Sequence, residues 1–286
     1  QRQMCIRDSS GADNYENVYS HTDAALIVNA TPVGMYPRNG ERLVDLSRFP
    51  KLECVLDVVY NPARTQLLLD AEKLGVTAMS GLAMLVIQAA AAAERFTGGK
   101  PKNSVEVVLA DIGRGMQNIL LVGMPGSGKS SLGRRVASNL GLPFIDTDQR
   151  IEQSVGCSTS DIFAHYGEQA FRNAETNMLI ELSREQGSIV STGGGLVLRD
   201  VNREIMRNTG VIVLLDRPLE EIMGDIKLNR RPLLAQKGLG EVERLYHERI
   251  ELYRKAADAT LDNSHGYQAG MYGLQKLITT MFNIYA

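Results

Sequence analysis

One eight-residue segment limits what this chain can fold into more than any other. Residues 123–130 read GMPGSGKS, which fits the pattern G-x-x-x-x-G-K-[ST]. The apolar run ILLV precedes it and an amphipathic stretch follows, so the segment predicts a strand, a glycine-rich loop and a helix. Such a loop turns backbone N–H groups toward phosphate oxygens, and the helix N-terminus adds a favourable dipole. The alternative is a glycine-rich turn with a solvated lysine.

The residue types in this loop predict a role for each part of a bound nucleotide. Lys129 supplies a compact positive charge for the β- and γ-phosphates, and the Ser130 hydroxyl is a ligand for Mg²⁺. We therefore expect ATP with Mg²⁺ as the cofactor pair. The predicted ATP-binding residues are Gly123, Met124, Pro125, Gly126, Ser127, Gly128, Lys129, Ser130 and Ser131.

Composition excludes several classes of protein. The chain has 286 residues, of which 44% are hydrophobic, and a formal net charge of −2, so disorder is not its dominant state. This charge balance offers no field for nucleic acid or an anionic membrane. Three cysteines without a CxxC pair favour a reducing compartment, and we expect a cytoplasmic protein. The apolar stretch 81–93 is too short for a membrane span, and we expect it to be a buried helix.

The pattern of apolar runs predicts two α/β units. Buried strands are expected at 24–32 and 54–62, and a third strand with a turn at 76–81. Helices are expected at 65–74 and 81–96, which implies parallel βαβ packing. The breaker-rich segment 98–104 is the best linker. Strands are then expected at 119–123, 143–148, 188–195, 211–216 and 259–262, with a terminal helix over 268–284. We divide the chain into residues 10–99, a linker at 100–116, and residues 117–286.

The first nine residues have no plausible cap or periodicity. Residues 1–9 read QRQMCIRDS, which resembles the end of a transposase sequencing adapter translated in frame. We interpret this segment as an artefact and exclude it from the fold. On this hypothesis the true gene continues upstream. Amplifying the locus and finding these codons in place would refute the hypothesis.

Two acidic residues follow the strand expected at 143–148. On an extended strand, Asp146 and Asp148 share one face at the carboxyl end of a parallel sheet, where ligands bind. One can hold Mg²⁺ through water and the other can accept a proton from a substrate hydroxyl. The alternative is that this Asp-Thr-Asp segment only caps the helix beginning near Gln149.

Five further motifs follow the phosphate loop in order. They are DTDxxIE from Asp146, GExxFRxxE over 167–175, STGGG over 191–195, RPLL over 231–234 and RxxLY over 249–253. Together they resemble shikimate kinase over residues 117–286. The resemblance implies a parallel sheet with flanking helices, of the P-loop nucleoside-monophosphate-kinase type, and ATP and shikimate as substrates. Phosphate would go to the 3-hydroxyl of shikimate, a step in the synthesis of chorismate and the aromatic amino acids.

The resemblance also implies a role for each matching residue. Asp148 would be the catalytic base, Asp146 would lie near Mg²⁺ with Ser130, and Arg231 would meet the γ-phosphate from a mobile lid. Residues implied to surround shikimate are Asp148, Arg172, Gly194, Gly195 and Arg249, with Glu175 orienting an arginine. Guanidinium forks suit a carboxylate, and consecutive glycines allow close backbone approach. From its residue type alone, Arg249 could equally be a surface helix arginine, and the pair Arg230 and Arg231 a solvated run.

The chain departs from the family pattern at one position. Many relatives have an arginine that packs on adenine seven residues before the lid arginine, but this chain has Gly224 there, with Lys227 nearby. The adenine contact is therefore open. The segment around Asn263 and Ser264 is a guess for it.

The N-terminal region carries a second resemblance. NATPVGM over 29–35, DVVYNPxxTxLL over 57–68 and GxxMLxxQ over 81–88 resemble the C-terminal third of shikimate dehydrogenase, over about residues 12–99. This implies a partial Rossmann-like unit ahead of the kinase region. The matching residues are Thr31, Met35, Tyr60, Gly81, Met84 and Gln88. From the residues alone, Tyr60 would be a packed strand aromatic and Gln88 a core-helix amide.

No G-x-G-x-x-G opens a βαβ unit before residue 24. We therefore expect that the intact gene encodes a fused dehydrogenase–kinase and that this chain lacks dehydrogenase activity. NADP(H) would serve only the intact dehydrogenase.

Two other functions compete with a shikimate kinase. One is a kinase of the same fold for another small polyol acid, such as gluconate. The other is a nucleotide-binding module that regulates its dehydrogenase partner. The sequence leaves the oligomeric state open, and a monomeric kinase region is compatible with it.

Overall fold

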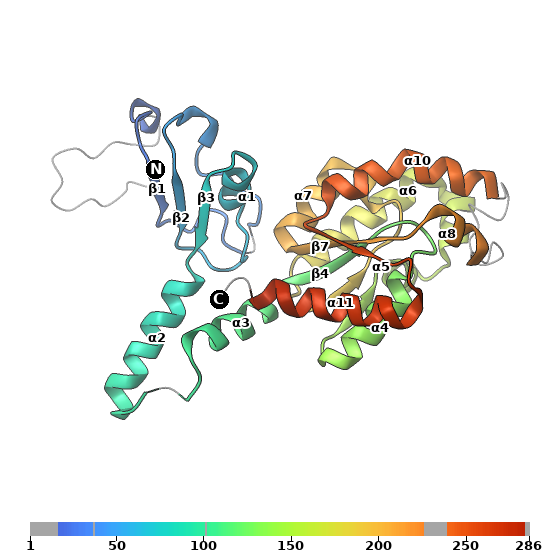
Figure 1. The fold of residues 1–286 in the computed structure, drawn as a ribbon. Coiled ribbons are helices and arrows are strands. Elements are labelled where there is room, and N and C mark those ends of the chain that lie inside the picture. The colour runs from blue at the N-terminus through green and yellow to red at the C-terminus, as the bar shows by residue number, and fades with distance from the viewer. Residues whose placement is uncertain (1–16, 37, 101, 226–238, 284–286) are drawn as a thin grey trace. The chain divides into compact units, whose positions relative to one another are not determined.

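The computed structural model describes residues 17–36, 38–100, 102–225 and 239–283. The chain forms two compact units, Gln1–Met84 and Leu85–Ala286 (Figure 1). The boundary falls inside helix α2 (Leu82–Thr97). Each unit has its own sheet and its own core, and they are described separately below.

The first unit is built on a three-stranded sheet in the order β1-β2-β3. Its strands are parallel, as the sequence predicted. Helix α1 packs against β2 and β3. It begins after Thr65, whose hydroxyl accepts a hydrogen bond from the Leu68 amide, and ends before Gly75, whose φ is +71°. The elements are η1 (Val18–Ser20), β1 (Leu26–Asn29), η2 (Leu46–Arg48), β2 (Cys54–Asp57), α1 (Gln66–Lys73) and β3 (Thr77–Ser80).

The prediction that the strand at 24–32 is buried was wrong. Leu26 and Val28 of β1 are 55% and 48% exposed, and Met79 of β3 is 53% exposed. Val28 and Met79 flank Leu56 in register, so they share one face of the sheet. The core of the unit contains Val55 together with Leu67, Leu68 and Ala71 of α1. One face of the sheet is therefore packed and the other carries exposed apolar side chains.

Helix α2 was also predicted to be buried, and this was wrong for most of its length. Leu82 and Val86 are buried, but Ile87 is 55% exposed and Phe96 is 90% exposed. The run of five alanines at 89–93 explains how an exposed segment stays helical, since alanine has the highest intrinsic helix propensity. Over the described part of the chain, the helices are too short or too polar to span a bilayer.

The second unit begins earlier than the segment predicted at 117. Helix α3 occupies 105–115, where a linker was expected; it starts after Ser104, whose hydroxyl accepts from the Val107 amide, and packs against α11. The remaining elements, in chain order, are α3 (Val105–Gly115), β4 (Asn118–Val122), α4 (Lys129–Leu140), β5 (Phe144–Asp146), α5 (Thr147–Val155), α6 (Thr159–Leu182), β6 (Ile189–Ser191), η3 (Leu196–Leu198), α7 (Asp200–Thr209), β7 (Gly210–Asp216), α8 (Leu219–Asp225), α10 (Leu239–Ala256), β8 (Ala259–Asp262) and α11 (Gly266–Asn283).

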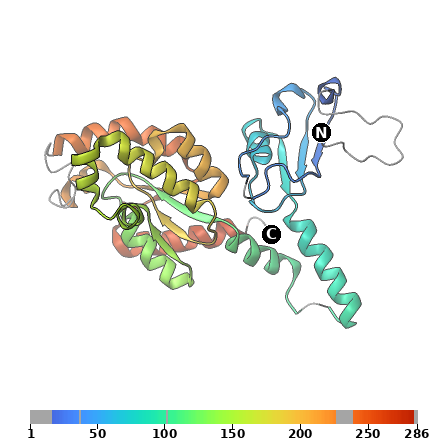
Figure 2. The ribbon, with the colours of Figure 1, turned by 180° about the vertical axis from the view of Figure 1, so that it is seen from behind.

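The sheet of the second unit is parallel throughout, in the order β5-β6-β4-β7-β8. Helices α4 and α11 cover one face, and α6, α7 and α10 cover the other, as the two opposite views show (Figures 1 and 2). The central strand β4 is buried at every position. Two apolar clusters follow, one on each face: Leu132 and Leu274 belong to one, and Leu179 and Tyr253 to the other.

This topology determines where a ligand can bind. After β4 the chain forms β5 and β6 on one side of β4, and then β7 and β8 on the other side, so the direction of strand addition reverses at β4. In open parallel sheets ligands bind at this point. The segment 123–130 lies directly there.

Candidate active site

The loop between β4 and α4 has the conformation expected of a phosphate cradle. Gly128 adopts φ +95°, and a side chain there would also press against Asn263 at 3.1 Å. Lys129 is buried, and its ammonium donates to the carbonyl oxygens of Gly123 and Met124 at 2.8 and 2.9 Å. The lysine therefore lies folded over the loop, with its charge held where phosphate oxygens would be bound.

Asp146 and Asp148 do not share a strand face, which corrects the prediction. β5 ends at Asp146, and Asp148 lies in the first turn of α5. The Asp146 carboxylate accepts from the backbone amides of Asp148 and Gln149, so it does cap the helix, and it also accepts from the Ser130 hydroxyl at 2.7 Å. The strand ends at Asp146 and does not continue to Asp148, because the Asp146 carboxylate satisfies backbone amides that the start of a helix leaves unpaired. The Asp146 carboxylate therefore caps α5 and contacts Ser130 at the same time.

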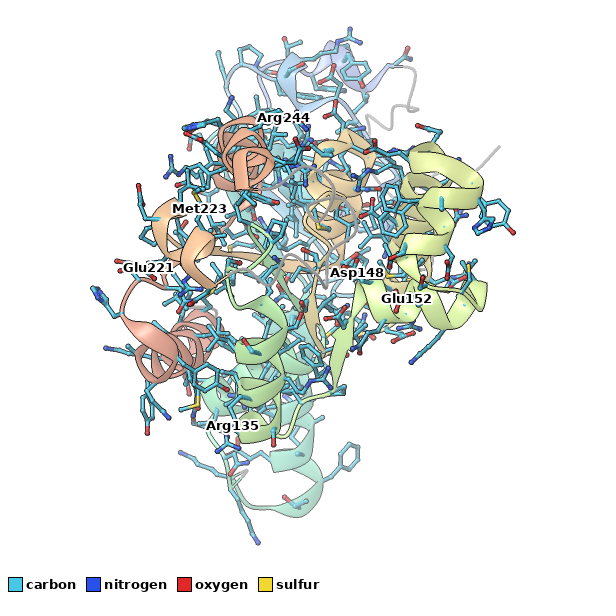
Figure 3. The ribbon with its side chains drawn as sticks, turned by 90° about the vertical axis from the view of Figure 1, so that its right-hand side faces the viewer. Arg135, Asp148, Glu152, Glu221, Met223 and Arg244 are labelled. Atoms are coloured by element: carbon cyan, nitrogen blue, oxygen red, sulfur yellow. The ribbon has the colours of Figure 1, made fainter. Side chains whose placement is uncertain are left out.

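Asp148 faces the interior of the site from α5. Figure 3 shows Asp148 and Glu152 one turn apart along this helix. The Asp148 carboxylate lies against Gly193, where an added Cβ would meet its Oδ1 at 2.5 Å. Gly193 is fixed in turn by its amide, which donates to the Thr147 hydroxyl at 2.8 Å.

Arg172 is held by two carboxylates of its own helix, α6. Its Nη1 donates to Glu175 at 2.8 Å, and its Nη2 and Nε donate to Glu168 at 3.0 and 3.3 Å. Burial works against the charged form of Arg172, but Glu175 and Glu168 raise the pKa of its guanidinium. Glu175 is buried, whereas the Glu168 side chain is 64% exposed. One partner of the arginine is therefore fixed and the other can be displaced into solvent.

The environment of Glu175 favours its neutral form. Burial raises its pKa to about 7, although the Arg172 charge and hydrogen bond oppose the shift, and the nearby Asp148 adds to it. Within the described residues, the Oε1 atom of Glu175 is buried without a hydrogen-bond partner. Glu175 contacts Arg172, the arginine that it is predicted to orient, at 2.8 Å.

The turn over 193–195 needs glycine because side chains approach it closely. A Cβ at Gly195 would lie 1.9 Å from Arg172 Nη1. The Gly194 carbonyl accepts from Arg249 Nη1 at 3.3 Å and from the Tyr253 hydroxyl at 2.5 Å. Burial raises the pKa of this hydroxyl to about 12, so Tyr253 is a neutral donor at pH 7. Sequence reasoning assigned Tyr253 no role, although the RxxLY motif contained it.

These groups meet in one cavity of about 600 Å³. Arg249 is 8% exposed and lines the cavity, so it is not the surface arginine that its residue type allowed. Within the described residues its Nε atom is buried without a hydrogen-bond partner. The lining residues include Pro125, Gly126, Gly128, Lys129, Ser130, Ser131, Asp146, Asp148, Phe163, Phe171, Arg172, Glu175, Gly193, Gly194, Gly195 and Arg249. The cavity thus joins the phosphate loop to two guanidinium groups and to carboxylates.

Several predicted nucleotide-side residues are placed differently or cannot be placed. Arg231 and Lys227 lie outside the described residues. Gly224 is exposed on α8, with nothing within 4 Å of where a side chain would begin. Asn263 is buried beneath the phosphate loop, where its amide donates to the Ser127 carbonyl at 2.8 Å. Arg217, which no motif had indicated, donates from Nη1 to the Gly126 carbonyl at 3.1 Å.

In the first unit, the motif residues form a closed hydrogen-bond network. The buried Asp57 carboxylate accepts from Asn29 Nδ2 at 2.9 Å, from the Thr65 hydroxyl at 2.6 Å and from the Val59 amide at 3.0 Å. Burial raises the pKa of Asp57, while these three hydrogen bonds oppose the shift. Thr31 donates from its amide and hydroxyl to Asn29 Oδ1. The network ties the ends of β1 and β2 to the start of α1.

The other residues of the dehydrogenase resemblance are mostly exposed. Met35 is 46%, Tyr60 42% and Met84 52% exposed, and Gln88 is also exposed. The packed strand aromatic and the core-helix amide expected from residue type are therefore both wrong. Gly81 is an exception, because a Cβ there would lie 2.0 Å from the Val58 carbonyl oxygen.

Comparison with known proteins identifies the second unit. The family model "Shikimate kinase" matches residues 125–279, more than half of the chain. This chain belongs to the shikimate kinase family. A shikimate kinase from Clostridium beijerinckii is 42% identical over 51% of this chain and 85% of its own length. The P-loop nucleoside-monophosphate-kinase-like fold predicted from the motifs is confirmed by solved structures.

Two solved shikimate kinases align with most of their own length. The enzyme from Acinetobacter baumannii, in complex with shikimate, is 33% identical, with a TM-score of 0.55, over 60% of this chain and 96% of its own. The enzyme from Aquifex aeolicus is 31% identical, with a TM-score of 0.51, over 59% and 98%. A chorismate mutase/shikimate 5-dehydrogenase fusion protein from Clostridium acetobutylicum is 35% identical over 34% of this chain and 37% of its own, with a TM-score of 0.32.

Proposed function

We propose that this chain transfers the γ-phosphoryl group of ATP to the 3-hydroxyl of shikimate. One observation carries the proposal: Arg172, Arg249 and Asp148 line the same cavity as Lys129 and the phosphate loop. These residues come from four different helices, so their convergence is a property of the fold. Two cations and one carboxylate beside a nucleotide cradle suit a small hydroxy acid as acceptor.

The two arginines bind the carboxylate of the acceptor. Guanidinium groups recognise a carboxylate through paired N–H donors, and burial strengthens these charge-assisted hydrogen bonds. Glu175 fixes one side of the Arg172 fork, and the exposed Glu168 leaves when the acceptor carboxylate takes its place. Arg249, whose side chain lines the cavity, offers its guanidinium to the same ligand.

Asp148 accepts the proton of the hydroxyl that attacks the γ-phosphorus. Phosphoryl transfer leaves little covalent chemistry to the protein, so positioning and neutralisation of charge supply most of the rate. Lys129 exchanges its two loop carbonyls for phosphate oxygens as ATP binds. Arg231 would stabilise the transferring group from a lid that excludes water.

The residues near the loop fit Mg²⁺ as the ion that accompanies ATP. Ser130 and Asp146 offer a hydroxyl and a carboxylate 2.7 Å apart, and hard oxygen ligands of this kind suit Mg²⁺. Among the residues that the structure describes there is no cluster of three or more metal-binding side chains. This agrees with an ion held mainly by phosphates and water. When bound, Mg²⁺ would neutralise charge on the β- and γ-phosphate oxygens.

A coupled assay of ADP release tests the proposal. We expect turnover with shikimate and a lower kcat/KM with quinate and with gluconate, because both keep the carboxylate but place their hydroxyls differently relative to Asp148 and the γ-phosphate. Lys129→Met is the matched negative control. Equal turnover with gluconate would favour another polyol-acid kinase, and ATP binding without any acceptor turnover would favour a regulatory module.

The first unit forms the second part of the proposal. We infer from its three motifs that it is related to shikimate dehydrogenase, in a gene that joins the two activities, and that this chain has no dehydrogenase turnover of its own. Oxidation of NADPH by dehydroshikimate in the presence of the purified chain would contradict this. A cytoplasmic location belongs to the same proposal, since Cys54 and Cys157 are free thiols.

A further inference from the structure

The carbonyl groups of the phosphate loop are held from behind by two side chains. Gly126 O accepts from Arg217 Nη1 at 3.1 Å, and Ser127 O accepts from Asn263 Nδ2 at 2.8 Å. Arg217 follows β7 and Asn263 follows β8. The ends of β7 and β8 are also joined directly, because the backbone N–H of Asn263 donates to the Asp216 carbonyl at 2.8 Å. Two neighbouring strand ends therefore hold two successive peptides of the loop.

Because a peptide is planar, a hydrogen bond to its carbonyl oxygen also determines where its N–H points. In a planar trans peptide, the C=O and the following N–H point to opposite sides. The first held peptide obeys this rule: its carbonyl meets Arg217, and its other end, the Ser127 amide, donates to the Met124 carbonyl at 3.0 Å. In the second peptide the carbonyl meets Asn263, so the Gly128 amide points away from Asn263. Gly128 lines the cavity, whereas Asn263 is not among the described residues that line it.

The position of Asn263 is enforced by its surroundings. It is 8% exposed, and a side chain at Gly270 of α11 would come within 2.1 Å of its Oδ1. A side chain at Gly128 would approach its Nδ2 at 3.1 Å. Two glycines from separate elements thus leave room for the side-chain amide of Asn263. Its Oδ1 is buried without a hydrogen-bond partner among the described residues, and turning the side chain away would also leave its Nδ2 as a buried unpaired donor.

We propose that Asn263 is a positioning residue for nucleotide phosphates: by holding the Ser127 carbonyl, it aims the Gly128 amide into the phosphate cradle. This rests on the proposed ATP-dependent function and adds a determinant outside the motifs. It also replaces the prediction of an adenine contact near Asn263. The two roles differ in the part of ATP that they affect.

Calorimetric titration with two probes separates these roles. ATP carries a base, whereas inorganic tripolyphosphate has only phosphates. Asn263→Ala should raise the dissociation constants of both probes by about the same factor, roughly 10-fold for one lost buried hydrogen bond. Shikimate binding should change less than about twofold, because Asn263 lies outside the cavity. Asn139→Ala is the matched control, since it removes an amide that joins α4 to Gln275 of α11 away from the loop.

Four results would overturn the proposal. They are weaker ATP binding with unchanged tripolyphosphate binding, which would indicate a base contact; no change with either probe; an equal loss of shikimate affinity; and an equal loss in the Asn139→Ala control. If Asn263→Ala does not fold, Asn263→Leu fills similar space without a donor and must give the same pattern. Because the readout is binding, a chain that binds both probes but does not phosphorylate shikimate would refute the proposed function and leave this test intact.

Discussion

The two units use buried polar motif residues to opposite effect. In the first unit, the Asp57 carboxylate accepts hydrogen bonds from Asn29, Val59 and Thr65. We call this network closed because both carboxylate oxygens have protein donors. In the second, Glu175 Oε1 and Arg249 Nε are buried without hydrogen-bond partners among the described residues, and the two side chains line a cavity of about 600 Å³. A buried polar group without a partner is costly unless a ligand completes it. The comparison teaches that motif residues indicate a binding site only where the fold leaves some of their polar atoms without protein hydrogen-bond partners.

The largest effect is expected at the open network. Asp148→Asn removes the base but keeps the shape of the side chain, so kcat should fall by about 100- to 10,000-fold. Unfolding temperature should change little. Steady-state ADP release and a thermal melt on the same sample measure both quantities. A kcat within tenfold of wild type would show that another group takes the proton.

A substitution in the closed network around Asp57 should reduce the stability of the first unit and leave kinase activity unchanged. Asp57→Ala leaves the donors of Asn29, Val59 and Thr65 without their acceptor, and the free energy of unfolding of the first unit should fall by about 3 kcal/mol. Hydrogen exchange at β2 amides measures this. Kinase kcat/KM should be unchanged.

Asp45→Ala is the control for that variant. Asp45 is exposed and caps the short 3-10 helix η2, so its substitution should cost less than about 1 kcal/mol. A large loss of kinase activity in Asp57→Ala would contradict the contrast between the two networks.

The raised pKa of Glu175 predicts a pH dependence. Its folded-state pKa of about 7 lies above the ordinary value near 4.5, so the folded state holds this proton more tightly than the unfolded state. The contribution to stability is full below about pH 4.5 and is lost as pH rises through 7. From pH 5 to pH 8, wild type should lose about 2 kcal/mol relative to Glu175→Gln. Parallel stability curves for the two proteins, measured by urea unfolding, would refute the shift.

The smallest effect should come from the partner of Arg172 that can be displaced. Glu168→Gln removes an exposed charge that competes with the acceptor carboxylate, so KM for shikimate should fall by about twofold, as an exposed ion pair is worth about 0.5 kcal/mol. KM for ATP should stay constant. A rise in KM for shikimate would mean that Glu168 helps to hold the acceptor.

Much of this arrangement could be predicted because local chemistry dictates it. GMPGSGKS requires a loop between a strand and a helix, and the parallel strands follow from buried β-branched runs. Asp148 was misplaced because β5 is only three residues long and Asp146 ends it as a cap. Residue 105 onward was read as a linker because the apolar stripe of α3 is short.

Other features depend on contacts that have no local signature. Arg217 and Asn263 reach the phosphate loop across 91 and 136 residues of sequence. The exposure of Leu26 and Phe96 was missed because an apolar side chain predicts burial only when another element covers it. Glycine at 270 and tyrosine at 253 could have been suspected only from knowledge of their neighbours in space.

The central claim is that Arg172 and Arg249 together recognise the carboxylate of the acceptor. The most direct measurement compares kcat/KM for shikimate with that for its uncharged carboxamide, in wild type and in the Arg172→Ala/Arg249→Ala double variant. We predict that wild type prefers the acid by at least about 100-fold, from two charged hydrogen bonds at about 1.5–3 kcal/mol each, and that the double variant shows no preference. A double variant that keeps the full preference for the acid would contradict the account.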